Sequence, residues 1–311
     1  MSEGPNHGSG TKIRDRLQVP DSNVFLPYTR IHGRRPGPTL LVTAGIHGGE
    51  YPGIEAAIRF AQALDPGRLR GTVNVVHMTN PPAFFAKSQY FTPEDGKNLN
   101  RVFPGRVDGS LSERIAHSVM SLAKESDYWV DLHGGDIHEA LTPFLIYSDQ
   151  GGPLVVERSR AMAEAYGIRY ILESSSIAGS TYATSAQVGV PAILAEAGGV
   201  GQLSEDAVQI HLDGLENVLR LLDLVSDPLP RVETKPIFRK FVWTHASTQG
   251  LFYPLVQVGQ EVHHGDLAGR LQNEYGDLIQ EIVAPQSGVV LFVVTSLAIV
   301  DGDPLLAVAS E

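Results

Sequence analysis

The chain has 311 residues, of which 42% are hydrophobic and none is cysteine, and its formal net charge at pH 7 is -11. This length can bury the core of one large domain, or of a large domain with a smaller one. The acidic balance argues against nonspecific binding to nucleic acid or to an anionic membrane, because both require a basic surface. Without cysteine, disulfides, thiolate metal sites and cysteine nucleophiles are excluded.

The first 18 residues are polar and glycine-rich, and they lack the apolar stretch of a signal peptide. We therefore expect residues 1–18 to form a loose lead-in. No apolar run reaches the ~20 residues that a membrane span requires. The simplest location is the cytoplasm, without a nucleic acid or membrane partner, and a homo-oligomer is compatible with the sequence.

Short apolar runs alternate with amphipathic stretches between residues 39 and 225, which is typical of an α/β domain with a mixed, largely parallel sheet flanked by helices. The predicted strands cover residues 39–45, 72–78, 127–133, 143–149, 168–172 and 191–197. The predicted helices have apolar residues at spacings of three and four. They cover residues 53–65, 112–125, 153–167 and 204–225. Ser112 and Ser204 are the predicted N-caps of two of them.

The first predicted strand leads into a glycine-rich segment, GIHGGEYPG, at residues 45–53. Glycine lets the backbone turn tightly and approach a bound group closely. His47 and Glu50, a histidine and a carboxylate three residues apart, are a possible pair of metal ligands. A catalytic zinc site usually has three protein ligands and one open position, so we expect a third ligand at the end of another strand.

A polar loop, DGKNLNRVFPG, occupies residues 95–105. It contains Asn100 and Arg101, and a planar guanidinium beside an amide is well shaped to hold a carboxylate. An Asn-Arg pair is a weak motif when it stands alone.

The strand predicted at residues 127–133 supplies the third ligand, because it ends in His133 and is followed by two glycines. Ligands of open α/β sheets bind at the carboxyl ends of the strands, where both candidate segments lie. A single histidine in a turn is more often a surface or hydrogen-bonding residue than a ligand. Two glycine-flanked turns after apolar strands favour a metal site, whereas a surface role is favoured for His138.

The strand predicted at residues 191–197 places Glu196 inside an apolar run and before two glycines. A charge in that position is costly unless it is paired or functional. One interpretation is a salt bridge to a helix. The other is a general base that takes a proton from water and hands it to the leaving group, and the location at the same sheet edge favours this catalytic role.

The pattern changes at residues 226–236, where two prolines within three residues and a polar run indicate a linker. From residue 237 onward short strands separated by turns predict a small all-β domain. Its two similar halves resemble the barrel-sandwich fold of lipoyl and biotinyl domains, but the exposed hairpin LQNEYGDLIQ lacks the lysine of a cofactor carrier. We predict a catalytic domain at residues 1–232 and a structural or substrate-facing β domain at residues 233–311.

The motifs HGGE, NLNRVFPG, DLHGG and AEAGG occur in that order. Together they resemble the succinylglutamate desuccinylase and aspartoacylase family, zinc hydrolases related in fold to the zinc carboxypeptidases (M14-type), and within it the N-acetyl-diaminobutyrate deacetylase-like subgroup. The resemblance covers about residues 35–311. It implies a deacylase that cleaves a small N-acyl amino acid or related amide by attack of zinc-bound water. It also implies one Zn²⁺ per chain held by His47, Glu50 and His133, with Glu196 as general base and then acid.

The same resemblance implies that Asn100 and Arg101 bind the substrate carboxylate. The family usually carries a second arginine shortly before this pair, where it can stabilise the oxyanion, but SQYFTPEDGKNLNR has none before Arg101. Tyr90 stands near that place, and Lys87 or Lys97 can reach it. Loss of an oxyanion donor costs about two to three powers of ten in rate, so either another donor substitutes or the substrate differs.

Two other functions are compatible with such a fold. One is metallocarboxypeptidase-type trimming of a short peptide, and the other is a noncatalytic binding protein. The noncatalytic hypothesis predicts the loss of a ligand or of the base, and none of these residues is missing, which favours an enzyme. If the β domain covers the pocket, His245 or Tyr253 is placed to contact the substrate.

Overall fold

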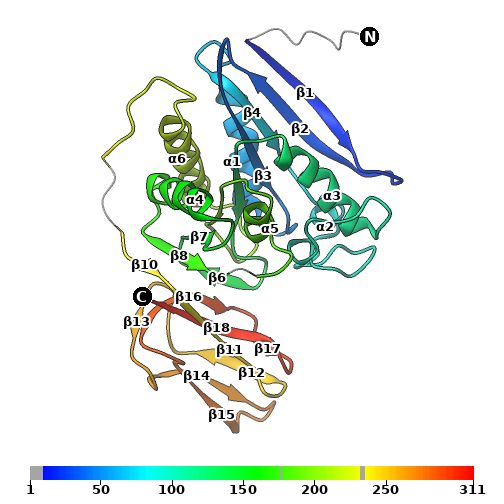
Figure 1. Ribbon diagram of the computed structural model, residues 1–311. Coiled ribbons are helices and arrows are strands. Elements are labelled where there is room, and N and C mark those ends of the chain that lie inside the picture. The colour runs from blue at the N-terminus through cyan, green and yellow to red at the C-terminus, as the bar shows by residue number, and fades with distance from the viewer. Residues whose placement is uncertain (1–9, 176, 232–234) are drawn as a thin grey trace.

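A nine-stranded mixed sheet forms the centre of the larger domain, in the order β1-β2-β4-β3-β5-β9-β7-β8-β10 (Figure 1). The computed structural model describes residues 10–175, 177–231 and 235–311. The neighbouring strands from β4 through β3 and β5 to β9 are parallel, and β7 runs antiparallel to β9. The strands are β1 (Thr11–Gln18), β2 (Phe25–His32), β3 (Arg35–Ala44), β4 (Arg70–Val76), β5 (Tyr128–His133), β7 (Phe144–Ser148), β8 (Tyr170–Ser174), β9 (Ala192–Glu196) and β10 (Ile237–Phe238).

Helices cover both faces of this sheet, and the central strands are therefore apolar on both sides. In β5, Trp129 packs with α3 on one face, while Val130 packs with α1, α4 and α6 on the other. The short helix α5 lies on the same face as α3, at the β7–β9 end. The helices are α1 (Tyr51–Ala63), α2 (Pro81–Ala86), α3 (Leu111–Lys124), α4 (Pro153–Tyr166), α5 (Thr181–Gln187) and α6 (Glu205–Leu221), with a 3-10 turn η1 (Leu99–Arg101). No helix in the described part of the chain is both long and apolar enough to cross a membrane.

The six strands and four helices predicted between residues 39 and 225 are present, with shifts of a few residues at their ends. The prediction of a loose lead-in is wrong for residues 11–18, because β1 pairs with β2 along its whole length at the edge of the sheet. Residues 1–9 lie outside the described residues. Ser204 is the N-cap of α6, as predicted. Ser112 is not a cap: α3 starts after Ser110, and Ser112 donates a hydrogen bond to Asp95.

The smaller domain contains only strands between residues 240 and 311, which confirms the all-β prediction. One sheet has the order β11-β18-β16-β13, and the other has the order β15-β14-β12-β17. The two sheets share a core that includes Phe252, Leu271, Val290 and Leu306. The strands are β11 (Lys240–His245), β12 (Gly250–Pro254), β13 (Glu261–Val262), β14 (Leu267–Gln272), β15 (Leu278–Val283), β16 (Gly288–Val294), β17 (Ala298–Ile299) and β18 (Pro304–Ser310).

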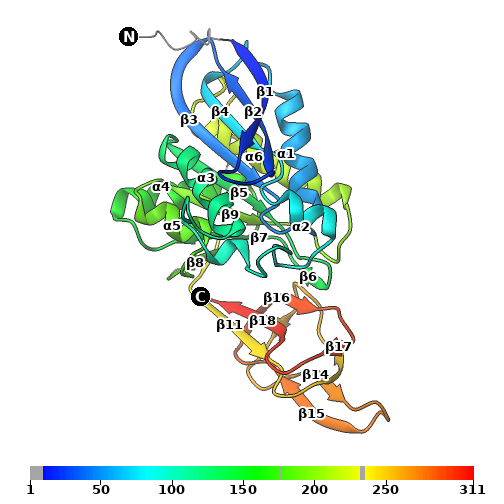
Figure 2. The ribbon, with the colours of Figure 1, turned by 90° about the vertical axis from the view of Figure 1, so that its right-hand side faces the viewer.

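Two strands join the domains, which lie one above the other in Figures 1 and 2. The strand β6 (Glu139–Leu141) leaves the larger domain and pairs with β16. In the other direction, β10 follows the linker but pairs with β8 in the large sheet. The boundary predicted between residues 232 and 233 falls on residues 232–234, which lie outside the described residues.

The contact between α4 and α6 depends on the small size of Gly214. A Cβ atom at this position would lie 2.0 Å from Tyr166 Cε1, and Tyr166 is only 1% exposed. We expect Gly214→Ala to lower the free energy of unfolding by about 1–3 kcal/mol, because overpacking outweighs the better helix propensity of alanine. Urea unfolding measures the loss, with the neighbouring exposed Asp213→Ala as control. Equal stability of Gly214→Ala and the wild type would contradict this packing.

Candidate active site

The candidate site lies at the carboxyl ends of three adjacent parallel strands. His47 follows β3 by three residues, His133 is the last residue of β5, and Glu196 is the last residue of β9. His133 and Glu196 are direct register partners. Segments far apart in the sequence therefore meet at one sheet edge, as expected for ligand sites in open α/β sheets.

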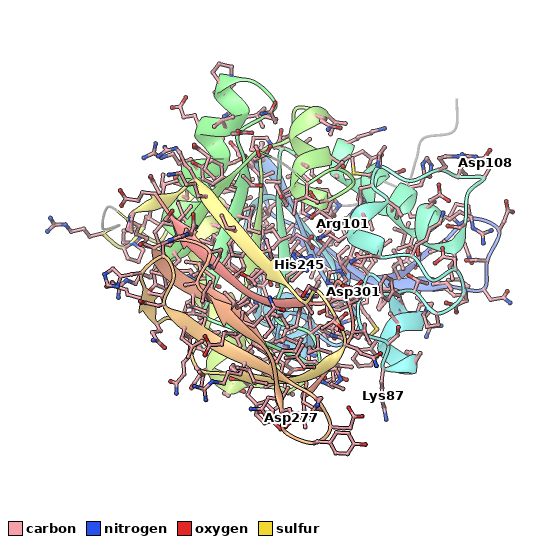
Figure 3. All side chains as sticks on the ribbon, turned by 90° about the horizontal axis from the view of Figure 1, so that it is seen from below. Lys87, Arg101, Asp108, His245, Asp277 and Asp301 are labelled. Carbon is pink, nitrogen blue, oxygen red and sulfur yellow. The ribbon has the colours of Figure 1, made fainter. Side chains whose placement is uncertain are left out.

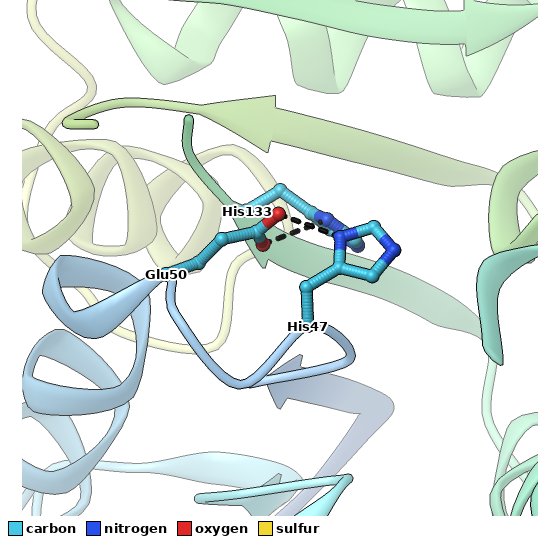
Figure 4. Close-up of side chains that lie close together, drawn as sticks. All are labelled: His47, Glu50 and His133. Carbon is cyan, nitrogen blue, oxygen red and sulfur yellow. Dashed lines mark hydrogen bonds and ion pairs between the residues drawn. The ribbon is translucent and has the colours of Figure 1, made fainter. Parts of the chain in front are cut away.

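The Glu50 carboxylate faces the imidazoles of both His47 and His133 (Figure 4). His47 Nδ1 is 2.6 Å from Glu50 Oε1, and His133 Nδ1 is 3.0 Å from Glu50 Oε2. One ligand atom from each of the three side chains lies within 4.8 Å of the others, so the group can hold a metal ion. All three side chains are buried.

Glycines let the turn after β3 bring this group together. Gly45 has a φ of +69°, in the left-handed region that favours glycine. A Cβ on Gly49 would lie 2.0 Å from Asp136 Oδ1, so only glycine fits between the turn and that carboxylate. Glu50 then stands at the N-cap of α1, and its side chain is free to face the histidines.

Asp131 fixes the orientation of the His133 ring. His133 Nε2 lies 2.9 Å from Asp131 Oδ2, and the same carboxylate accepts hydrogen bonds of 2.6 Å from the hydroxyls of Thr43 and Thr181. A proton on Nε2 leaves Nδ1 to face Glu50, which is the arrangement that a metal ligand requires. Burial alone would lower the pKa of His133, but the carboxylates of Glu50 and Asp131 outweigh burial and hold it well above its ordinary value.

His211, on α6, contacts the backbone of the site. It is fully buried, its Nε2 donates a hydrogen bond of 3.1 Å to the carbonyl of His133, and its Nδ1 lies 3.1 Å from the hydroxyl of Tyr166. Burial lowers the pKa of His211 to about 4, so the ring is neutral at pH 7. His138, in contrast, is exposed, in agreement with the surface role predicted for it.

Glu196 directs an unpartnered oxygen into the same site. Its Oε2 is buried and has no hydrogen-bond partner among the described residues, and the side chain lines the central cavity with His47 and His133. Burial, together with the negative charges of Glu50 and Glu139, raises the pKa of Glu196 well above its ordinary value. In the described parts of the chain Glu196 forms no salt bridge to a helix, which was the alternative interpretation.

Asn100 and Arg101 reach the cavity from η1. The Asn100 side chain is buried, and its Oδ1 accepts a hydrogen bond of 2.9 Å from the N–H of Thr181. The Arg101 guanidinium donates to the Asn100 carbonyl at 2.7 Å and has no acidic partner in the residues described. Asn98, which the sequence did not single out, contacts His47 Nε2 through its Oδ1 at 3.1 Å.

Of the three groups predicted near the missing arginine, only Tyr90 lines the cavity. Its hydroxyl donates to Glu139 Oε1 at 2.5 Å, and its N–H donates to Asp136 Oδ2 at 2.9 Å. These two hydrogen bonds hold Tyr90 at a positive φ of 58°. Lys97 is instead ion-paired with Glu113 at 2.9 Å. Lys87 forms the C-cap of α2 and points away from the cavity (Figure 3).

The cavity lies between the two domains and has a volume of about 710 Å³. Arg101 and His245 both line it and lie near the centre of the view from below (Figure 3). Tyr253 does not line it. The β domain therefore contributes directly to the wall, and His245 is the better placed of the two residues predicted to contact a substrate.

The charges around the site are suited to a cation. Glu50, Asp131, Asp136, Glu139 and Glu196 bring five carboxyl groups close together, and burial raises the pKa of Asp136 and takes that of Glu139 to about 7. Buried carboxylates are costly unless a positive charge balances them. The imidazole and carboxylate donors match the nitrogen and oxygen ligands that zinc takes.

The fold and this site define an α/β enzyme with three side chains that could hold a metal ion at the carboxyl edge of its sheet. The model of the succinylglutamate desuccinylase/aspartoacylase catalytic domain matches residues 36–222, and the chain belongs to that family. The predicted resemblance is thereby confirmed.

Relatives extend the similarity over most of the chain. N-alpha-acetyl-L-2,4-diaminobutyric acid deacetylase from Halomonas elongata is 30% identical over 91% of this chain and 83% of its own length. Succinylglutamate desuccinylase from Pseudomonas paraeruginosa is 28% identical over 66% of this chain and 64% of its own length. The product-bound structure of the ectoine utilization protein EutE (DoeB) from Ruegeria pomeroyi superposes with a TM-score of 0.90, at 27% identity over 99% of this chain and 97% of that chain.

Replacing Asp131 by asparagine tests its hold on His133. The amide would offer only one acceptor oxygen and an NH₂ group where three donors converge. We expect Asp131→Asn to weaken Zn²⁺ binding about 10- to 100-fold, measured by competition with a chromophoric chelator. Asp127→Asn, at the exposed position just before the same strand, is the matched control. Wild-type affinity in Asp131→Asn would refute the role of this carboxylate.

The raised pKa of Glu139 predicts a pH-dependent stability. The pKa of Glu139 is about 7 in the folded protein and near 4.5 in the unfolded chain. Between these pH values the folded state binds more protons than the unfolded state, so the free energy of unfolding falls as the pH rises from 4.5 to 7. Glu139→Gln removes the titration. We expect the free energy of unfolding of the variant, relative to that of the wild type, to be about 1–3 kcal/mol higher at pH 7.5 than at pH 4.5.

Urea unfolding of the chelator-treated proteins at both pH values measures this difference. The exposed Glu281→Gln is the control for the change of charge. A difference between Glu139→Gln and wild type that does not vary with pH would contradict the buried, proton-binding state of Glu139.

Proposed function

We propose that the protein is a zinc-dependent amidohydrolase that removes an acyl group from a small N-acyl amino acid or a related amide. The observation that carries this proposal is the convergence of three metal-ligating side chains with the unpartnered Oε2 of Glu196 in one cavity. The deacetylase and desuccinylase names of the relatives give it further support.

Zinc is the metal that we propose for the group His47, Glu50 and His133, with one ion per chain. Two imidazoles and a carboxylate leave an open coordination position, as catalytic zinc sites do. When bound there, the ion supplies Lewis acidity toward the amide carbonyl and lowers the pKa of a water molecule. Asp131 keeps the Nδ1 of His133 directed at the metal position, because it holds the Nε2 proton.

Glu196 is the proton-transfer group in this mechanism. It accepts a proton at Oε2 from the attacking water and gives it to the amide nitrogen, which then leaves as an amine. Its raised pKa suits both steps, because a carboxyl group that binds a proton more readily is a better acceptor and still returns the proton to a basic nitrogen. The burial of the site keeps bulk water from competing for that proton.

The substrate carboxylate binds to Arg101 in this proposal. The guanidinium has no acidic partner in the described chain and lines the cavity, and Asn100 positions it through its own carbonyl. Tyr90 contacts the substrate beside His47, with a ring centroid 6.2 Å from that of the imidazole. The Tyr90 hydroxyl donates its hydrogen bond to Glu139, so it can donate to the oxyanion only if that hydrogen bond breaks.

We also propose that residues 1–232 and 233–311 act as a catalytic and a β domain, and that the β domain is a barrel-sandwich of the lipoyl and biotinyl type. Its two facing sheets are compatible with this architecture. The β14–β15 hairpin carries no lysine, which supports a role other than cofactor carriage. The cytoplasmic location stays a prediction from the sequence.

The decisive experiment compares two variants of the site. Glu196→Gln should retain about one zinc per chain by elemental analysis and lose about 10²- to 10⁴-fold in kcat, because only proton transfer is removed. His47→Ala should lose both the metal and the activity. Activity is measured as amine release from N-acetyl and N-succinyl amino acids, with short peptides included to test the carboxypeptidase alternative. A Glu196→Gln variant with full activity would refute the mechanism, and a metal-free, inactive wild type would favour a binding protein.

A further inference from the structure

The cavity has an aromatic wall that the chemistry of amide cleavage does not use. In the β domain, Trp243 packs between Phe241 and Phe292, with ring centroids 5.1 and 4.8 Å away. Phe144 from β7 continues the row, 5.8 Å from Phe241. All four rings line the cavity, and Trp243 remains 37% exposed.

Two apolar side chains of the larger domain line the same cavity without being buried. Phe91 follows Tyr90 and is 48% exposed, and Ile177 precedes α5 and is 45% exposed. Exposed apolar side chains that gather in a concave site are typical of ligand-binding surfaces. The cavity thus has a polar end, at Glu196 and Arg101, and apolar walls from both domains.

The charged groups beside the aromatic wall neutralise each other. Arg239 donates to Glu173 at 2.8 Å, and the hydroxyl of Tyr147 donates to the same carboxylate at 2.6 Å. Arg239 and Glu173 thus compensate each other's charge, and neither is free to pair with a succinyl carboxylate or a diaminobutyrate ammonium. Apolar surface is what remains available, and its burial by a ligand is favourable in proportion to the area covered.

We propose that this wall is a subsite for an aromatic or aliphatic group of the substrate. The preferred amides then carry a substituent that is much larger than an acetyl methyl and apolar along its length. The inference rests on the proposed amide hydrolysis and narrows its substrate class. The apolar group belongs either to the acyl part or to the side chain of the amino acid, and both present the same chemistry to Trp243.

Two substrate series separate these sources. In one, glycine carries acyl groups from acetyl to octanoyl and phenylacetyl. In the other, acetyl is attached to glycine, leucine, phenylalanine, aspartate and 2,4-diaminobutyrate. We expect kcat/KM to rise by up to about fourfold per buried methylene in the series that reaches the wall. Highest kcat/KM on the acetylated charged amino acids, with no rise in either series, would overturn the proposal.

Variants of two aromatic residues of the β domain locate the effect. Trp243→Ala should flatten the rise with apolar size and lower kcat/KM for the largest substrates by about tenfold or more, mainly through KM. Tyr275→Ala removes a ring that is 83% exposed and does not line the cavity, and the rise should persist. Equal profiles of Trp243→Ala and Tyr275→Ala would overturn the assignment to Trp243.

A binding measurement distinguishes failure of the subsite from failure of the proposed function. Calorimetric titration of Glu196→Gln with N-octanoylglycine, N-acetylphenylalanine and N-acetylglycine needs no turnover. Tighter binding of either larger compound than of N-acetylglycine, lost on adding Trp243→Ala, supports the subsite even if the wild type hydrolyses nothing. Equal binding of all three compounds overturns the subsite even if the wild type is an active deacylase.

Discussion

The buried carboxylate of Asp131 is the interaction on which the site depends. It accepts hydrogen bonds from Thr43 on β3, His133 on β5 and Thr181 at the start of α5, so three segments are tied to one charged group. The indole of Trp129 donates to the same Thr43 hydroxyl and extends the network into the core. A charge so deeply buried is tolerated only when its partners are complete, and the register of these segments is thereby fixed.

The proposed metal ligands and the proposed proton-transfer group were predictable because each carries a local signal. His47, Glu50 and His133 stand in glycine-flanked turns directly after apolar strands, and Glu196 is a charge inside an apolar run. A parallel sheet brings such strand ends to one edge. Predicting that these four residues lie together requires only an approximate order of the strands. The sequence was therefore enough for this prediction.

The supporting residues had no such signal. Asp131 and Thr43 are 88 residues apart, and Asp131 and Thr181 are 50 residues apart, so their contacts depend on details of packing. His211 lies within the helix predicted at residues 204–225, and its sequence context carries no signal of a contact with the site. The edge strand β1 was missed because its sequence lacks apolar alternation. Lys97 was an incorrect candidate because its partner, Glu113, lies in the following helix.

The strand β6 gives the assembly of the cavity a temporal order. In this strand Glu139 pairs with Val294 and Leu141 pairs with Phe292 of β16. The pairing closes a loop of about half the chain. Such long loops form late, because their closure costs the most entropy. During synthesis the ribosome releases β16 near the end of the chain. The larger domain can therefore emerge with His47, Glu50 and His133 already close together while Phe241, Trp243 and Phe292 are still absent, and the nascent protein passes through a stage in which the cavity lacks its β-domain wall.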